Sequence, residues 1–126
     1  MSPATCTQVT SWPEGVRKWA LFERPPNFEW GDERVTLLGD ACHPMRPFMS
    51  QGAAMALEDA TVLVDELTGH DDLEAALAAY TTRRRDRAGA VVGNSVQLAR
   101  WLLEQDPAAD VPGLMARTSA LLTQHP

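Results

Sequence analysis

The spacing of the hydrophobic residues changes near the middle of the chain. In the first half they form short runs, Val16–Phe22 and Arg34–Leu38, each bounded by turn residues. Such runs are typical of strands, and the second one suits a strand buried on both faces of a parallel sheet. Residues 1–15 and 23–32 are rich in polar residues, Pro and Gly, and predict a terminal loop and a connection.

From Gln51 onward the apolar residues recur at helical spacing. The positions that predict the first helix are Ala53, Ala56, Leu57, Ala60, Leu63, Val64 and Leu67. Gly69 lies where the helix is expected to end, because glycine accepts the left-handed conformation that often follows the last turn. The preceding loop, residues 41–50, contains two prolines, which exclude a regular helix there.

A second helical pattern follows directly. Asp71 is its expected N-cap, and Glu74, three residues later, completes a capping-box pattern. The apolar positions continue to Leu103 and predict either one long helix or two helices that meet at Gly89 and Gly93, where helix propensity is weak. The pattern therefore leaves the number of helices open.

The predicted order of elements indicates an incomplete sheet. Asp106-Pro107 should end the second helical region, and the apolar stretch 114–122 predicts a last helix. A buried parallel strand needs neighbours on both sides, and this chain offers only one or two strands before its helices. We therefore expect the C-terminal part of a larger α/β fold.

Composition narrows the class of protein. The chain has 126 residues, with 11 basic and 17 acidic side chains, and its net charge of −6 disfavours nucleic-acid binding. No run reaches the roughly 18 apolar residues that span a bilayer, and the N-terminus has no signal-peptide pattern. Because Cys6 and Cys42 are the only cysteines, we expect a reducing, cytoplasmic location and no membrane partner.

The loop between the second strand and the first helix carries the candidate chemistry. Asp40 follows the strand, and in open α/β sheets ligands bind in the crevice at this end of the strands. Its carboxylate can accept hydrogen bonds from the hydroxyls of a sugar or a ribityl chain. The helix that starts at Gln51-Gly52 presents N–H groups without intrahelical partners, and Gly52 lets a flat ligand approach closely. A flavin combines a polyhydroxyl chain with a ring that develops negative charge.

The same run resembles the FAD-dependent aromatic-ring hydroxylases, which are single-component flavoprotein monooxygenases. Their signature is GDAAH-x-x-x-P-x-x-G-Q-G-x-N/A followed by a Glu-Asp-Ala helix. In this chain it is present as Gly39-Asp40-Ala41-Cys42-His43, Pro47, Ser50-Gln51-Gly52 and Glu58-Asp59-Ala60. The flanks 19–26 and 80–87 are similar to the family's preceding substrate-domain strand and to its Tyr-x-x-Arg-x-x-Arg helix. The resemblance covers about residues 12–104 and is nearest to the salicylate hydroxylase and 6-hydroxynicotinate 3-monooxygenase subgroup.

The resemblance implies a role for each matching residue. Asp40 would bind the ribityl hydroxyls or the pyrophosphate side of FAD, and Pro47 would lie on the loop between flavin and substrate. The other implied FAD-binding residues are Gln51, Gly52, Ala53 and Ala54. The N–H groups of the last three would face the N1–C2=O edge of the isoalloxazine, which becomes anionic on reduction. The implied reaction uses NADH or NADPH to reduce FAD and then uses O₂ to hydroxylate a small phenolic or hydroxypyridine substrate.

The chain also departs from the family. No two of its eight glycines are two residues apart, so the GxGxxG fingerprint that cradles the FAD pyrophosphate is absent. The resemblance therefore implies a partial FAD/NAD(P)-binding, Rossmann-like α/β fold. Residues 1–33 would be the remnant of the substrate-domain strand and connection, and residues 34–126 the C-terminal part of the FAD-binding domain with a helical tail. Ser50, where the family often has Gly, is expected to cap the helix.

Other functions stay open beside this one. The chain can be a non-catalytic truncated remnant, or a subunit that needs a partner chain to supply the missing N-terminal half. It can also belong to another flavoprotein of the same fold, such as a halogenase or a reductase. No catalytic residue is assigned within the chain itself.

Several residue groups receive structural interpretations. Cys42-His43 lacks the further ligands and spacing of a structural zinc site, so no metal site is expected. The basic cluster is interpreted as a solvated helix face paired with nearby acids, and consists of Arg83, Arg84, Arg85 and Arg87. The tryptophans are assigned to the core or to an interface, and are Trp12, Trp19, Trp30 and Trp101. Met45 and Met49 are interpreted as gap fillers.

Overall fold

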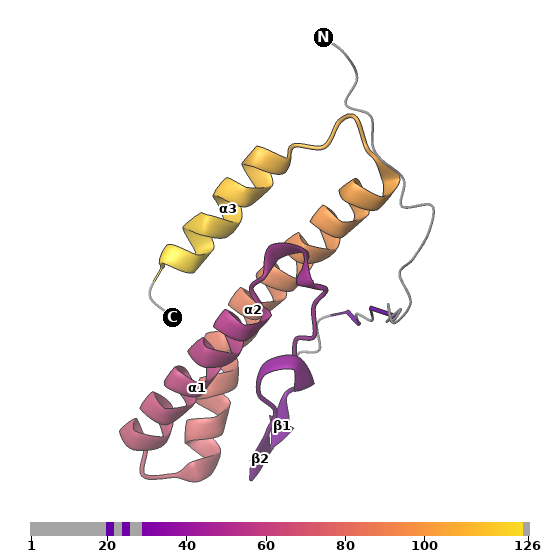
Figure 1. The fold of residues 1–126 in the computed structure, drawn as a ribbon. Coiled ribbons are helices and arrows are strands. Elements are labelled where there is room, and N and C mark those ends of the chain that lie inside the picture. The colour runs from indigo at the N-terminus through magenta and orange to yellow at the C-terminus, as the bar shows by residue number, and fades with distance from the viewer. Residues whose placement is uncertain (1–19, 22–23, 26–28, 125–126) are drawn as a thin grey trace, which may run out of the picture.

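The computed structural model of the chain describes residues 20–21, 24–25 and 29–124. Along these residues, short strands and 3-10 turns are followed by three α-helices (Figure 1). The elements are β1 (Gly31–Asp32), β2 (Val35–Thr36), η1 (Gly39–Ala41), η2 (Pro47–Met49), α1 (Gly52–Gly69), α2 (Leu73–Glu104) and α3 (Val111–Thr123). The strand predicted at Val16–Phe22 lies outside the described residues, apart from Ala20 and Leu21, which are not in a strand.

The sheet differs from the prediction. β1 and β2 form an antiparallel hairpin, in which Gly31 pairs with Thr36 and Asp32 pairs with Val35. The predicted parallel strand, buried on both faces, is wrong for the described residues, because Val35 is 63% exposed and β2 pairs only with β1 there. Two residues join the strands, and so short a connection permits only antiparallel pairing. The expected connection 23–32 therefore ends in a strand.

Helix α1 confirms the predicted first helix, but it buries another face. It spans Gly52–Gly69, as the apolar spacing predicts, but the expected cap at Gly69 is wrong, because Gly69 is the last helical residue and His70, in an extended conformation, is the C-cap. Its buried residues are Met55, Asp59 and Val62. The predicted apolar stripe is largely exposed, with Leu57 at 72% and Val64 at 58%. Because both stripes have helical spacing, the sequence pattern alone did not indicate which one would contact α2.

Helix α2 is one continuous helix of 32 residues that passes through both of its glycines. Its N-cap is Asp72, whose carboxylate accepts a hydrogen bond from the Ala75 amide at 2.9 Å. The predicted cap, Asp71, is wrong by one residue. Glu74 consequently lies at the second helical position rather than at the third, which a capping box requires. The regular helix is preserved at the glycines because it packs along most of its length against α1 and α3.

The last helix confirms the apolar stretch seen near the C-terminus. The last residue of α2 is Glu104. Its C-cap, Gln105, has a left-handed φ of 51° and lies one residue before the predicted stop. α3 then begins three residues earlier than predicted, because Asp110 caps it by accepting a hydrogen bond from the Gly113 amide at 2.9 Å. α3 folds back along the C-terminal half of α2 (Figure 1). None of the described helices is both long and apolar enough to cross a membrane.

Two apolar clusters hold these elements together. The first lies between α1, α2 and the hairpin and contains Trp30, Met55 and Tyr80. The second joins η2, α2 and α3 through Met49, Leu98 and Leu114. Trp30 is therefore a core residue, and Trp101 packs beside the second cluster, whereas Trp12 and Trp19 lie outside the described residues. Met45 packs against the first cluster and Met49 belongs to the second, so the loop between β2 and α1 is anchored to both.

The position of the α2 cap can be tested by a pair of substitutions. Asp72→Ala removes the acceptor for the Ala75 amide and should lower the free energy of unfolding by about 1 kcal/mol. Asp71→Ala removes the same charge one residue earlier and should change it by less than about 0.5 kcal/mol. Urea unfolding followed by far-UV circular dichroism measures both. Equal losses in the two variants would contradict the assignment of the cap.

Candidate functional site

Asp40 lies in the turn η1, whose backbone requires the glycine that precedes it. Gly39 has a φ of 60°, a left-handed conformation that favours glycine. A Cβ at this position would also lie 3.2 Å from the Cβ of Ala56, so the turn packs directly on α1. The carbonyl of Gly39 accepts hydrogen bonds from the amides of Cys42 and His43, both at 3.0 Å. Asp40 is consequently held on the exposed side of a compact turn.

The second half of the loop leads the chain into α1. The described residues 41–50 contain only short 3-10 turns and no α-helix, as the two prolines predict. Ser50 has a φ of 55°, and this left-handed conformation explains why a glycine is suited to the same place in the related motif. The expected cap at Ser50 is wrong, because Gln51 occupies the N-cap position and makes no side-chain capping hydrogen bond.

A cavity of about 580 Å³ opens between this loop and the start of α1. Its lining residues are Leu38, Gly39, Asp40, Met45, Pro47, Ser50, Gly52, Ala53 and Ala56. The structure thus brings four of the predicted site residues to one cavity, which we call the Asp40 cavity. Gln51 and Ala54 flank it in sequence but do not line it. Met45 lines the cavity and also packs against the first apolar cluster.

The Asp40 cavity combines a carboxylate with the positive end of a helix. The first hydrogen bond at the start of α1 runs from the Met55 amide to the Gln51 carbonyl at 2.9 Å, so the amides of Gly52, Ala53 and Ala54 precede it. A Cβ at Gly52 would lie 3.8 Å from Oδ1 of Asp40 and would project into this space. The cavity can therefore accept hydroxyl donors at Asp40 and an anionic, flat edge at the helix start.

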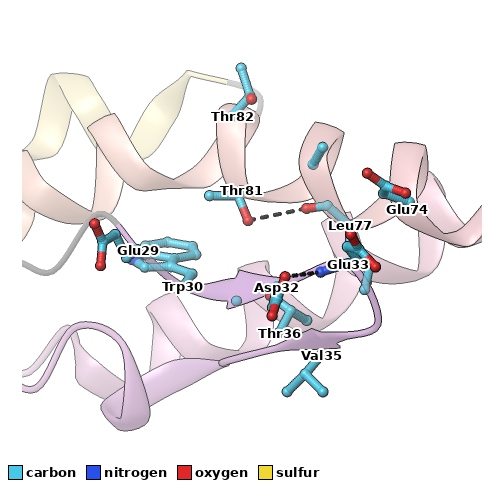
Figure 2. Close-up of a pocket in the computed structure, with 12 residues that line it drawn as sticks. Glu29, Trp30, Asp32, Glu33, Val35, Thr36, Glu74, Leu77, Thr81 and Thr82 are labelled. Carbon is cyan, nitrogen blue, oxygen red and sulfur yellow. Dashed lines mark hydrogen bonds between the residues drawn. The ribbon is translucent and has the colours of Figure 1, made fainter.

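A second hollow, of about 460 Å³, lies between the hairpin and α2 (Figure 2). Carboxylates dominate its charged side chains, which are Glu29, Asp32, Glu33 and Glu74. Apolar contact comes from Trp30, Val35 and Leu77. Four carboxylates repel a phosphorylated or carboxylate ligand, so the chemistry of this hollow suits an anionic nucleotide less well than the Asp40 cavity does.

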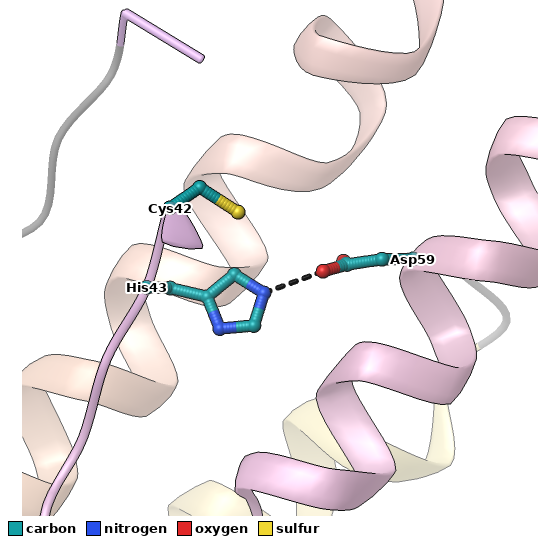
Figure 3. A group of neighbouring side chains, drawn as sticks. All are labelled: Cys42, His43 and Asp59. Atoms are coloured by element: carbon teal, nitrogen blue, oxygen red, sulfur yellow. Dashed lines mark hydrogen bonds and ion pairs between the residues drawn. The ribbon is translucent and has the colours of Figure 1, made fainter. Parts of the chain in front are cut away.

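Behind the Asp40 turn, a buried ion network connects the loop to both long helices. Nε2 of His43 lies 2.5 Å from Oδ2 of Asp59 on α1 (Figure 3). Oδ1 of the same carboxylate accepts a hydrogen bond from Nε of Arg84 on α2 at 2.8 Å. All three side chains are at most 1% exposed. Buried charges of this kind are stable only when they are paired and hydrogen-bonded.

The network continues along α2 through a second carboxylate. Glu58 accepts hydrogen bonds from Nη1 of Arg84 and from Nε of Arg87, both at 2.8 Å. Arg87 also donates to the carbonyls of Leu121 and Leu122 at the end of α3. The expectation of a solvated basic face is therefore wrong for Arg84 and Arg87, although their pairing with acids is confirmed. They lie on the side of α2 that packs against α1 and α3.

The pKa values of the paired groups favour their charged forms. Burial alone would lower the pKa of His43, but hydrogen bonds to Asp59 and Cys42 and the nearby negative charge raise it from 6.5 to about 9. Burial opposes ionisation of Asp59, but hydrogen bonds from His43, Arg84 and the Gly39 amide outweigh it and hold its pKa below its usual value. At neutral pH the network therefore contains an imidazolium and a carboxylate.

Cys42, His43 and Asp59 each place one possible metal-ligand atom within 4.8 Å of the others (Figure 3). Both oxygens of Asp59 already accept hydrogen bonds, and the Cys42 thiol donates to the Gly39 carbonyl at 3.2 Å. We therefore interpret the cluster as part of the ion network.

Sequence reasoning missed the roles of Asp59 and Arg84. The available signal was the acidic pair in the apolar helix 52–69, together with the spacing that places Tyr80, Arg84 and Arg87 on one helix face.

Comparison with known proteins identifies one family and several relatives. Residues 8–95 match the family described as FAD binding domain. Over 91 residues the chain is 48% identical to a 6-hydroxynicotinate 3-monooxygenase from Bordetella bronchiseptica, covering 71% of the chain and 24% of that protein. Over 94 residues it is 41% identical to a 3-hydroxybenzoate 6-hydroxylase from Klebsiella oxytoca, covering 74% and 24% respectively. A kynurenine 3-monooxygenase from Xanthomonas oryzae is 43% identical over 86 residues, covering 68% and 18%. The chain spans about a quarter, or less, of the length of these relatives.

The ion network predicts that stability depends on pH through His43. Because the folded-state pKa of His43 is raised, its contribution is complete below about pH 6.5 and is lost as the pH rises through about 9. The free energy of unfolding should fall by about 2–4 kcal/mol between pH 6 and pH 10. Urea unfolding at several pH values measures this fall.

Two variants distinguish His43 from the other titrating groups. His43→Phe should be less stable at pH 6 and should show a much flatter profile over the same range. His70→Gln removes an imidazole that is 38% exposed and should keep the original slope. A slope that is unchanged in His43→Phe would show that another group causes it.

Proposed function

The chain belongs to the FAD-binding domain family, and from this premise we propose that it is the C-terminal part of the FAD-binding domain of a flavoprotein monooxygenase. We further propose that the complete enzyme uses NADH or NADPH and O₂ to hydroxylate a phenolic or hydroxypyridine ring. The relatives include a 6-hydroxynicotinate 3-monooxygenase and a 3-hydroxybenzoate 6-hydroxylase, and the substrates in these names support this class. Family membership also confirms the resemblance drawn from residues 39–60.

The observation that carries the proposal is the Asp40 cavity. It joins a carboxylate, an apolar wall and the uncapped N-terminus of α1 in a single space. In our proposal Asp40 accepts hydrogen bonds from the ribityl hydroxyls of FAD, and the amides of Gly52, Ala53 and Ala54 stabilise the N1–C2=O edge. Gln51 sets the backbone direction at the helix start, and Pro47 with Met45 excludes water from the flavin. The chemistry supplied by bound FAD is two-electron transfer and activation of O₂.

The exposed apolar surface supports the view that further polypeptide covers this segment. Leu57, Val64 and Leu67 on α1 are 72%, 58% and 42% exposed, and Val35 on β2 is 63% exposed. Side chains of this kind on one helix normally pack against a neighbouring element. We propose that residues 34–126 complete a Rossmann-like domain whose other strands cover this surface, and that residues 1–33 connect it to the substrate domain.

A segment exchange tests the proposed function directly. In the Bordetella 6-hydroxynicotinate 3-monooxygenase, the matched segment would be replaced by the corresponding residues of this chain. The purified chimera should retain FAD, detected by its visible absorption spectrum, and should oxidise NADH or NADPH in the presence of 6-hydroxynicotinate. A folded chimera that contains no FAD would contradict the proposal. A chimera that binds FAD but oxidises neither cofactor would limit it to flavin binding.

Asp40→Ala in this chimera should weaken FAD binding about 10- to 100-fold, the effect of losing hydrogen bonds to a charged acceptor. Titration of the apoprotein with FAD, followed by quenching of flavin fluorescence, gives the dissociation constant. Asp86→Ala is the control, because it removes one carboxylate that is 85% exposed on α2. Unchanged affinity in Asp40→Ala would overturn the role assigned to Asp40.

Gly52→Ala separates flavin binding from stability. The added Cβ makes only ordinary contacts, at 3.8 Å and 3.9 Å, so the helix should remain folded and no less stable. The methyl group occupies the cavity where the flavin edge would lie, and FAD affinity should fall by about 10-fold. Gly93→Ala is the matched control, because it lies inside α2 with open space around its Cβ position. It should raise stability by about 0.5–1 kcal/mol and leave FAD affinity unchanged.

A further inference from the structure

The turn that carries Asp40 is held at both ends by one carboxylate oxygen. Oδ2 of Asp59 accepts a hydrogen bond from the amide of Gly39 at 3.0 Å. The same oxygen lies 2.5 Å from Nε2 of His43. Gly39 precedes Asp40 directly, and His43 follows it by three residues. A single buried atom of α1 therefore fixes a five-residue segment in which the exposed Asp40 lines the cavity, and the other exposed residue, Ala41, does not.

The other oxygen of Asp59 fixes the direction of that carboxylate. Oδ1 accepts a hydrogen bond from Nε of Arg84 at 2.8 Å, and Arg84 is fully buried on α2. Arg84 also donates to Glu58, which is bound in turn by Arg87. The chain of contacts thus runs from the Asp40 turn through α1 to α2. Of these two adjacent carboxylates, Asp59 makes the described contacts to the turn, and Glu58 makes its described contacts to arginines.

We propose that Asp59 is a positioning residue for FAD binding, which holds the Gly39–His43 turn in the conformation that presents Asp40 to the cavity. This inference rests on the proposed function, because it concerns how the chain's own residues are placed for the flavin. Asp59 does not line the cavity, and its contacts with the turn are to Gly39 and His43. Its effect on affinity is therefore indirect and depends on the geometry of the turn.

A carboxylate is required at position 59 by the number and charge of its donors. One amide N–H, one imidazolium and one guanidinium all point at Asp59, and two of these three groups carry positive charge. An asparagine offers one oxygen and an NH₂ group, so at least one of the cations would face another donor. In Asp59→Asn an NH₂ group replaces one of the two oxygens and the negative charge is lost, so the contact that holds the His43 end of the turn is weakened in either orientation, while the side-chain volume changes little.

The first test follows the turn in the 126-residue chain without flavin. Cys42 lies within the turn and is fully buried, so its alkylation rate reports release of the segment. Asp59→Asn should raise the rate about 10-fold or more at native conditions, and the rate should stay constant at low urea concentrations, as local opening predicts. Mass spectrometry of the Cys42 peptide, in a Cys6→Ser background, measures it. Glu58→Gln is the matched control: it leaves both contacts of Asp59 with the turn in place, so any increase in the rate should come through global unfolding and should grow with urea.

Global unfolding gives a different result. If Asp59 only stabilises the fold, the alkylation rate in Asp59→Asn will rise steeply with urea from the lowest concentrations, and this outcome overturns the proposal. If Asp59→Asn does not fold, His43→Phe replaces it in the test. This variant removes the contact between His43 and Asp59 and leaves the contact between Asp59 and Arg84 in place. The dependence of its Cys42 alkylation rate on urea then distinguishes local opening of the turn from global unfolding.

The second test measures FAD affinity in the chimera described above. Asp59→Asn should raise the dissociation constant for FAD by about 10-fold, and Glu58→Gln should leave it within about twofold. Equal losses in both variants, or no loss in Asp59→Asn despite faster alkylation of Cys42, overturn the positioning role. Failure of the unsubstituted chimera to bind FAD contradicts the proposed function instead, and the alkylation result stands independently of it.

Discussion

The buried carboxylate of Asp59 is the interaction on which the arrangement of this chain depends. It lies between an imidazolium from the loop and a guanidinium from α2, and it accepts the amide of Gly39 as well. Removing either cation would take the charged hydrogen-bond donor from one oxygen of this buried carboxylate, which destabilises the fold. The loop, α1 and α2 are therefore placed by one set of hydrogen bonds, and apolar packing around Trp30 and Tyr80 fills the space beside it.

The Asp40 cavity is a consequence of this arrangement. With the turn fixed on α1, the chain must pass through the left-handed Ser50 before the helix can begin. The first amides of α1 then face the same space as Asp40, because no side chain of Gln51 caps them. A ligand with hydroxyl groups and an anionic edge satisfies both ends of this space. The Asp40 cavity differs in charge from the hollow beside the hairpin, whose carboxylates would repel such a ligand.

The surfaces of the chain indicate how it fits into a larger protein. The relatives are about three to four times as long as the chain, and the chain matches one part of each. Its short hairpin and the exposed stripe on α1 carry apolar side chains that the described residues leave uncovered. The two apolar clusters, by contrast, are formed within the described segment, and the ion network leaves only the buried Nδ1 of His43 without a hydrogen-bond partner there. The described segment thus contains a core of its own and carries exposed apolar side chains on α1 and on the hairpin.

The sequence by itself determined the helical second half of the chain, the proline-containing loop before it and the family, but it left open whether the second helical region is one helix or two. These features depend on local spacing, on prolines and on a motif of fixed length, which the chain carries wherever it folds. Only the tertiary structure decided which stripe of α1 is buried, which arginines are paired inside, and how Asp59 holds the turn. These outcomes depend on residues 16 to 25 positions apart that meet only after α1 packs on α2. In the sequence, the two stripes of α1 have equal spacing and the four arginines of α2 are neighbours. Only the packing of the helices determines which stripe and which arginines are buried.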